Sequence, residues 1–143
     1  MSVRKMILKG ENADDISGPS WEQVREALLN IEPGHHSFII LNENDDFVQT
    51  LGRRDGLVVQ WRTRDGLYVL GRRGLERKGI PFIPGSTGYL EPVWENEVMN
   101  ITDAMVLFER FYKGQGIPEP YVLRDITDRN VVHEYAQLLR GNL

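Results

Sequence analysis

The side chains that most readily do chemistry in this 143-residue chain are three histidines, paired aspartates and a series of arginines. His35 and His36 are adjacent after a Pro-Gly pair, and adjacent side chains diverge on an extended chain. His133 lies far from both, and no H-E-x-x-H spacing occurs. Asp45 and Asp46 lack the spaced carboxylates of a calcium loop. The sequence therefore predicts no metal site and no cofactor.

The sequence also lacks the common motifs for a catalytic nucleophile and for a phosphate-binding loop. The segment G-S-T-G at residues 85–88 is neither G-x-S-x-G nor a P-loop, which needs a following Lys-Ser or Lys-Thr. No other pattern joins a nucleophile to a base, so we predict no catalytic residues and no enzymatic activity. A deep pocket in which Glu95 or Glu97 met His133 or an arginine would overturn this prediction.

The arginines offer a different chemistry, the binding of phosphate. They recur at the ends of predicted hairpins, with Trp61 and Tyr68 between them, and such interleaving can bind single-stranded nucleic acid. Against this, the pI is about 5.4, whereas nucleic-acid binders usually have strongly basic surfaces. Arginines at turns also protect sheet edges. We keep nucleic-acid binding by residues 53–77 as the alternative function, with a candidate set of Arg62, Arg64, Arg72 and Arg73.

Composition indicates one globular domain over residues 1–143. Hydrophobic residues make up 41% of the chain and charged residues 27%, which suits a core with a charged surface. The apolar runs are far too short for a membrane span, and the run at residues 6–8 is too short for a signal peptide. Cysteine is absent, which excludes disulfides and zinc-thiolate sites. We expect a cytoplasmic protein that does not enter membranes.

The net charge of −4 is spread unevenly. Residues 50–80 hold eight basic and three acidic side chains, while the segments on either side are acidic. An uneven distribution of charge affects solubility and association rates more than it affects the fold.

The elements that must position these side chains centre on residues 37–71. Apolar runs alternate there with polar breaks at residues 42–46, 53–56 and 62–66, and two of the breaks end in Asp-Gly. Asp-Gly between alternating apolar runs is a strong hairpin signal, because glycine accepts the positive φ of a tight turn. We predict four antiparallel strands in a meander.

Other elements follow from periodicity and capping signals. A strand is predicted at residues 3–9, a loop at 11–18 and a strand at 121–126. A first helix begins after Ser20, with Gln23 in the capping-box position, and ends before residues 33–34. A second helix is capped by Thr102 and stops at Gly114, and a third runs from residues 127–128 to 141.

Residues 71–92 are rich in glycine and proline, which argues against a continuous helix or strand. We predict weak order at residues 71–79 and burial of Phe82 and Ile83. A strand at residues 93–100 is predicted to lie at a sheet edge, where a second copy could pair and form a homodimer.

Together these elements predict an α+β fold. Five to six strands form a mainly antiparallel sheet with a β-meander at its centre. This sheet packs against about three helices. A more closed, barrel-like sheet is the alternative.

The order of several segments resembles the first of the bacterial immunity-protein families, whose members neutralise polymorphic or contact-dependent toxins. The resemblance lies in PSWEQVREAL (residues 19–28), SFIIL (37–41), FVQTLG (47–52), LVVQWR (57–62) and NEVMNITDAMVLFERFYKG (96–114). A short link then leads to the strand predicted at residues 121–126. The resemblance covers about residues 19–126.

This resemblance implies a small, non-catalytic cytoplasmic protein whose partner is a cognate toxin. Such a protein covers the toxin's active site or blocks its motion. An acidic chain suits a toxin that itself binds nucleic acid, because it competes for the same basic cleft. We predict Tyr89, Trp94, Glu95 and Glu97 as partner contacts.

Overall fold

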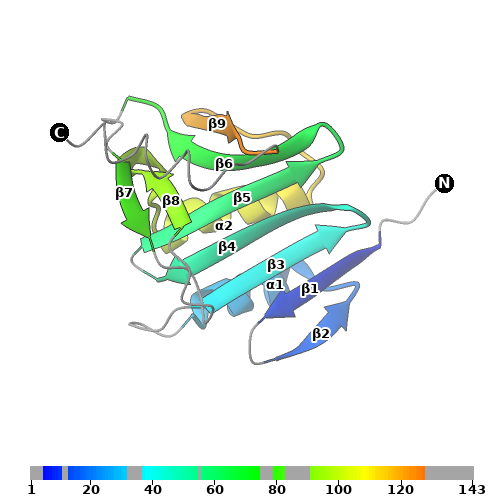
Figure 1. The fold of residues 1–143 in the computed structure, drawn as a ribbon. Coiled ribbons are helices and arrows are strands. Elements are labelled where there is room, and N and C mark those ends of the chain that lie inside the picture. Colours follow the sequence, from blue (N-terminus) through cyan, green and yellow to red (C-terminus); the bar gives the residue numbers. More distant parts are fainter. Residues whose placement is uncertain are drawn as a thin grey trace.

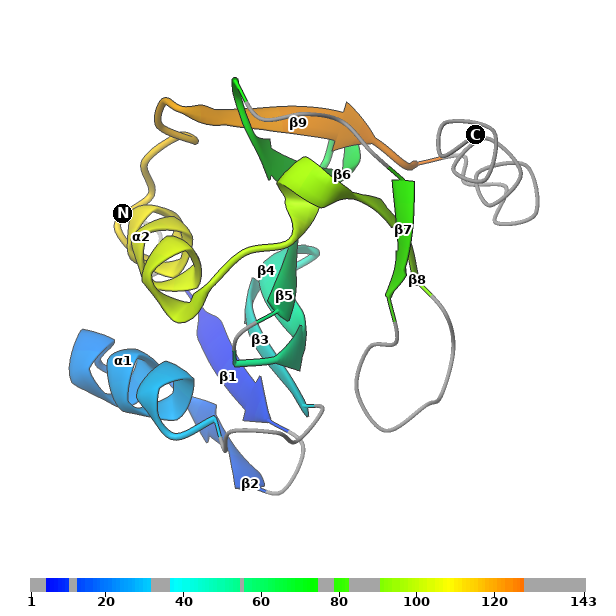
Figure 2. The ribbon, with the colours of Figure 1, turned by 90° about the vertical axis from the view of Figure 1, so that its left-hand side faces the viewer.

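The computed structural model describes residues 5–10, 13–31, 37–54, 56–74, 79–82 and 91–127 of the chain. Within them a seven-stranded sheet carries two α-helices on one face, and a two-stranded hairpin crosses the other face at one end (Figures 1 and 2). The predicted α+β class with a mainly antiparallel sheet is confirmed. The elements in chain order are β1 Met6–Gly10, β2 Ala13–Ser17, α1 Trp21–Leu29, β3 Ser37–Glu43, β4 Asp46–Arg53, β5 Gly56–Thr63, β6 Gly66–Arg72, β7 Gly79–Phe82, β8 Glu91–Trp94, the 3₁₀-helix η1 Glu95–Glu97, α2 Ile101–Tyr112 and β9 Tyr121–Asp125.

The predicted meander is confirmed as β3, β4, β5 and β6, which pair consecutively and antiparallel. Val48 of β4 lies between Leu41 of β3 and Trp61 of β5. The turn before β4 holds Asn44 at φ 56°, a conformation that asparagine tolerates better than most residues. Asn44 therefore suits the tight turn that joins β3 to β4.

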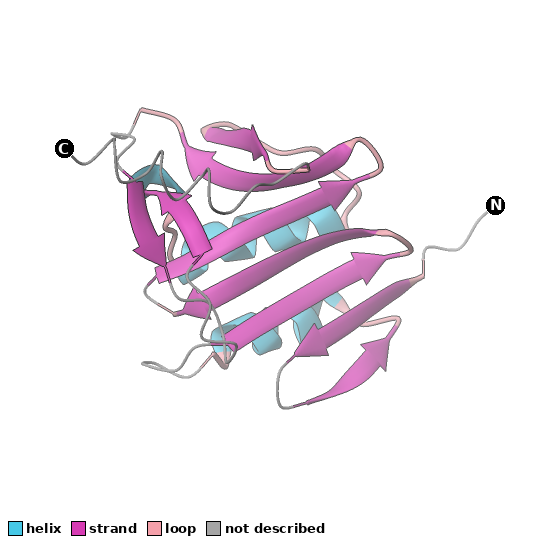
Figure 3. Cartoon of the chain, viewed as in Figure 1, coloured by secondary structure: helices cyan, strands magenta, loops and turns pink. Residues whose placement is uncertain are grey.

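The sheet is wider than predicted, with the order β2-β1-β3-β4-β5-β6-β9 (Figure 3). The strands predicted near the N-terminus and at residues 121–126 are present as β1 and β9. The loop predicted at residues 11–18 is wrong, because residues 13–17 form the outer strand β2. Its aspartates, Asp14 and Asp15, are exposed, as charged side chains on an edge strand usually are.

Both α-helices pack on the same face of the sheet, α1 behind β3 and α2 behind β4 and β5 (Figure 1). The capping box predicted for α1 is confirmed, since Ser20 Oγ accepts from Gln23 N at 3.1 Å and Ser20 N donates to Gln23 Oε1 at 2.9 Å. The predicted cap of α2 at Thr102 is wrong, because Asn100 occupies that position. The predicted third helix lies outside the described residues.

Two apolar clusters stabilise the two faces of the sheet. The main core lies between the sheet and the helices, where Leu28, Leu41 and Phe108 are fully buried. Trp61 meets Phe111 edge to face there, with ring centroids 5.3 Å apart. A second cluster joins Val58, Val69, Val93 and Ile126 on the opposite face. This smaller cluster attaches β8 and the end of β9 to the sheet.

The segment between residues 71 and 100 differs most from prediction. Gly71 and Arg72 belong to β6, so the irregular segment begins later than expected. The strand predicted at residues 93–100 ends at Trp94, and η1 follows it. Phe82 lies in β7, while the burial predicted for Phe82 and Ile83 lies outside what the structure describes. None of the helices in the described ranges has the length and apolar character to cross a membrane.

Candidate functional site: the η1 corner

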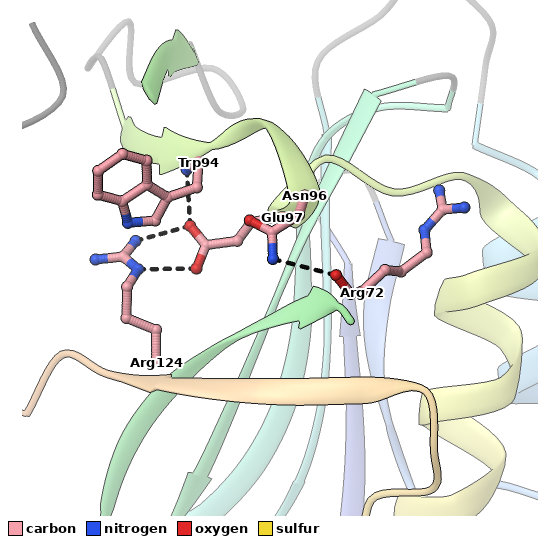
Figure 4. Close-up of polar contacts among 5 residues, drawn as sticks. All are labelled: Arg72, Trp94, Asn96, Glu97 and Arg124. Carbon is pink, nitrogen blue, oxygen red and sulfur yellow. Dashed lines mark hydrogen bonds and ion pairs between the residues drawn. The ribbon is translucent and has the colours of Figure 1, made fainter. Parts of the chain in front are cut away.

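The candidate site is the turn from β8 into η1, residues Trp94, Glu95, Asn96 and Glu97, here called the η1 corner (Figure 4). It rests on β6 at Gly71. A Cβ atom at Gly71 would lie 2.7 Å from Asn96 Nδ2, too close for any real side chain. Glycine at this position therefore lets η1 approach the strand.

The Glu97 carboxylate fastens the corner to β9. Arg124 Nε donates to Glu97 Oε2 at 2.8 Å and Arg124 Nη2 donates to Oε1 at 3.0 Å, a two-pronged contact. The same Oε1 accepts from Trp94 N at 2.8 Å. Glu97 is only 2% exposed, so its charge needs these partners in order to be buried.

Asn96 adds a second attachment, to the end of β6. Its Nδ2 donates to Arg72 O at 3.3 Å, and the side chain is buried. The corner is thus held by contacts from β6 and β9, which lie far apart from it in sequence (Figure 4). These contacts fix the backbone shape of the corner.

A second polar cluster lies beside the corner, between α2, β6 and β9. Arg72 Nη2 lies 3.0 Å from Asp103 Oδ2, and Tyr121 Oη donates to Asp103 Oδ1 at 2.7 Å. Burial raises the pKa of Tyr121 to about 12, and the hydrogen bond to Asp103 and the negative charge of Asp103 act in the same direction, while Arg72 opposes them. Each charged group of this cluster has a partner within it.

The predicted contact residues differ in how exposed they are in the structure. Glu95 is exposed and Trp94 is half-buried at the corner, so both remain predicted contacts. Glu97 does not lie at the surface, and its burial against Arg124 removes it from the predicted set. The reason is that the segment forms a 3₁₀ turn rather than a strand, which turns Glu97 toward β9. Tyr89 lies outside the described residues.

The arginines of the alternative site do not gather in one place. Arg62 and Arg64 are exposed at the β5–β6 turn, whereas Arg72 and Arg73 lie at the other end of β6. Arg72 pairs with Asp103, and Arg73 Nη1 lies 3.7 Å from Glu119 Oε1. The structure therefore places the candidate nucleic-acid residues in two separate pairs.

Carboxylate and guanidinium groups meet beneath the corner. Glu97 and Arg124 form a packed ion pair beneath the corner. Two surface depressions lie away from the corner: one of about 480 Å³ at the turns of β3–β4 and β5–β6, and one of about 290 Å³ between the β1–β2 hairpin and α1. The former is lined by residues 44–47 and 62–64. The described residues hold no group of three or more potential metal ligands.

Sequence reasoning missed Arg124 and Asp103. Arg124 lies 27 residues after Glu97, and no local pattern links the two. The only signal was an arginine within the short apolar strand YVLRD. Asp103 directly follows Thr102, the predicted helix cap, and no local pattern indicates its contacts with Arg72 and Tyr121.

Searches of the sequence against models of known protein families and against curated proteins find no match. The geometry of the described residues offers a rigid, partly aromatic and acidic corner, with the neighbouring charged side chains engaged in holding it.

Proposed function

We propose that this chain is a non-catalytic binding protein that neutralises a cognate bacterial toxin in the cytoplasm, as its resemblance to the immunity proteins implies. The observation that carries the proposal is the buried contact of Glu97 with Arg124, which fixes the η1 corner. A surface held in its bound shape loses less entropy on binding. Trp94 and Glu95 are then presented on a fixed frame.

Residue type supports the same role for the corner. Tryptophan is enriched among residues that dominate binding energy, and Trp94 is half-buried with part of its surface accessible. Glu95 adds an exposed negative charge beside it. Because the chain carries a net charge of −4, a basic toxin surface such as a nucleic-acid cleft is the matching partner.

The experiment is co-expression of the chain with the product of the adjacent gene in its genome. We expect that product to inhibit growth alone, and the chain to restore growth and to co-purify with it. The chain alone should not alter the toxin's substrate. Failure of both rescue and co-purification would contradict the proposal.

Matched variants test whether the η1 corner is the contact. Glu95→Lys and Glu22→Lys make the same charge change at exposed sites, but Glu22 lies on α1, on the opposite face of the sheet (Figure 2). We expect Glu95→Lys and Trp94→Ala to weaken toxin binding at least tenfold, and Glu22→Lys to leave it unchanged. Equal effects of the two lysine variants would place the contact elsewhere.

A further inference from the structure

The strand β9 is an outer strand of the sheet, and the structure describes no strand beyond it (Figure 1). Its central residue, Leu123, is 48% exposed. Leu123 and Val106, which is 40% exposed, are the large apolar side chains that stand out at the surface of the described residues. An exposed edge with an apolar side chain at its centre is a template for another strand.

The hydrogen bonds show which backbone groups of β9 point outward. Arg73 N donates to Pro120 O at 2.7 Å, and Ile126 N donates to Leu67 O at 2.8 Å. Even-numbered residues of β9 therefore face β6, since residues alternate in an antiparallel ladder. The N–H and C=O groups of Leu123 and Asp125 point away from β6, as does the C=O of Tyr121. The Tyr121 N–H instead donates to Pro118 O at 3.1 Å.

We propose that β9 binds a second copy of this chain by antiparallel pairing about a two-fold axis at Leu123. In this register Leu123 pairs with Leu123 of the second copy, and both exchange N–H and C=O bonds. Asp125 N–H donates to Tyr121 C=O in each direction. The two sheets then continue through the interface, and the two Leu123 side chains cover each other.

The charge pattern favours this register over the one centred on Arg124. With the axis at Leu123, Arg124 lies opposite Val122, and Asp125 lies opposite Tyr121. Moving the axis to Arg124 would place two arginines opposite each other, and like charges in that position are destabilising. The sequence of β9 is thus compatible with pairing to β9 of a second copy.

The other outer strand, β2, serves as an internal comparison. It has the sequence ADDIS, and both Asp14 and Asp15 are exposed. An antiparallel pair centred on Asp15 would bring two aspartates together. Charged side chains protect β2 from pairing in the usual way, whereas β9 presents Leu123 at the corresponding place.

The first test measures the mass of the full chain in solution as a function of concentration. A single short strand pair buries little area, so we expect a weak, reversible dimer, detected by sedimentation or light scattering. The mass should rise from 16.5 kDa toward twice that value at high concentration. Leu123→Lys should stay monomeric, while Ser17→Lys, on the exposed outer strand β2, should behave as the unmodified chain.

A monomer at every concentration, or a dimer that Ser17→Lys breaks and Leu123→Lys does not, would overturn the proposal. Circular dichroism checks that Leu123→Lys is folded. We expect it to be folded, because about half of the Leu123 surface is exposed and its backbone groups do not face β6.

A second test does not depend on the lysine variant. The chain has no cysteine, so Leu123→Cys introduces a single thiol on the proposed axis. Opposed residues in a hydrogen-bonded antiparallel pair have Cα atoms about 5.5 Å apart, within the range that a disulfide spans. We expect mild oxidation to cross-link Leu123→Cys at least tenfold faster than Ser17→Cys. Equal rates for the two variants would refute the register.

Discussion

At the scale of single residues, the Glu97–Arg124 pair explains why an acidic side chain lies buried in the η1 corner. Removing a carboxylate from water costs several kcal/mol, which close and doubly hydrogen-bonded partners offset. Here Arg124 supplies both contacts, and Trp94 N supplies a third. The pair fixes the position of the η1 corner, and we expect it to contribute specificity of shape rather than net stability.

Breaking one half of this pair should therefore cost more than replacing both. We expect Arg124→Met to lower the free energy of unfolding by roughly 3–5 kcal/mol, because it leaves Glu97 buried without a cation. The double variant Glu97→Gln with Arg124→Met should recover much of that loss. Urea denaturation of the two single variants and the double variant measures the coupling. Strictly additive effects would show that the two side chains do not depend on each other.

Tyr121 gives a prediction about alkaline pH. Its pKa is about 12 in the folded chain, against 10.0 for an ordinary tyrosine, because of burial, the hydrogen bond to Asp103 and the charge of Asp103. The folded state therefore holds this proton more tightly than the unfolded state. The resulting stability is fully present below pH 10 and is lost as the pH rises through about 12.

The measurement combines absorbance of tyrosinate with denaturation at several alkaline pH values. We expect Tyr121→Phe to remove a tyrosine that ionises near pH 12 and to flatten the fall in stability above pH 10. An unchanged titration curve in this variant would contradict the pKa assignment.

At the scale of elements, the start of α2 shows how a capping signal can be misplaced. Thr102 and Asn100 are both good caps, and sequence alone favoured Thr102. In the structure Asn100 Oδ1 accepts from Asp103 N at 3.0 Å, and Asp103 Oδ2 accepts from Asn100 N at 3.2 Å. The reciprocal pair identifies Asn100 as the cap.

This assignment predicts a contrast between two alanine variants. Asn100→Ala should destabilise the chain by about 0.5–2 kcal/mol, because it leaves a helix N–H without its acceptor. Thr102→Ala should change little, since Thr102 is exposed and lies inside the first turn. Thermal or urea unfolding decides between them, and the reverse order of effects would restore Thr102 as the cap.

Elements defined by local chemistry could be predicted, whereas those defined by tertiary contacts could not. The hairpins of β3 to β6 follow from alternating apolar runs separated by short polar breaks, and α1 follows from its capping box. The glycines of the two Asp-Gly pairs, Gly56 and Gly66, begin the strands β5 and β6 rather than occupying the turns. The strand β2 was missed because its aspartates gave it the composition of a loop. The segment after Trp94 gave no sign of η1, because its turn depends on Asn96 and Glu97 reaching β6 and β9.

At the scale of the whole molecule, the sheet order joins distant parts of the chain. Turns predict that consecutive strands pair, yet nothing local indicates that β9 pairs with β6 after α2 has intervened. The contact of Asp103 with Tyr121 and that of Glu97 with Arg124 both depend on this placement. The groups that hold the η1 corner therefore could not be predicted from local sequence, while the role of Trp94 and Glu95 as partner contacts stays a prediction.

The distribution of arginines bears on the alternative function, the binding of single-stranded nucleic acid. A protein that binds a single strand needs a continuous basic groove with aromatic side chains along it. Arg62 and Arg64 lie at one end of β6, and Arg72 and Arg73 lie about 20 Å away at the other, by the usual rise of a strand. Arg72 and Arg73 are also paired with carboxylates, which would have to be displaced before a phosphate could bind.

We accordingly expect fluorescence anisotropy of labelled single-stranded DNA and RNA to show no binding at physiological salt up to high micromolar protein. A basic single-strand-binding protein serves as the positive control. Binding that weakens steeply with salt, and that Arg62→Ala with Arg64→Ala reduces equally for all sequences, would instead support the alternative. In that case the exposed pair at the β5–β6 turn would be the contact, because these two arginines lie apart from the Asp103 and Glu119 ion pairs.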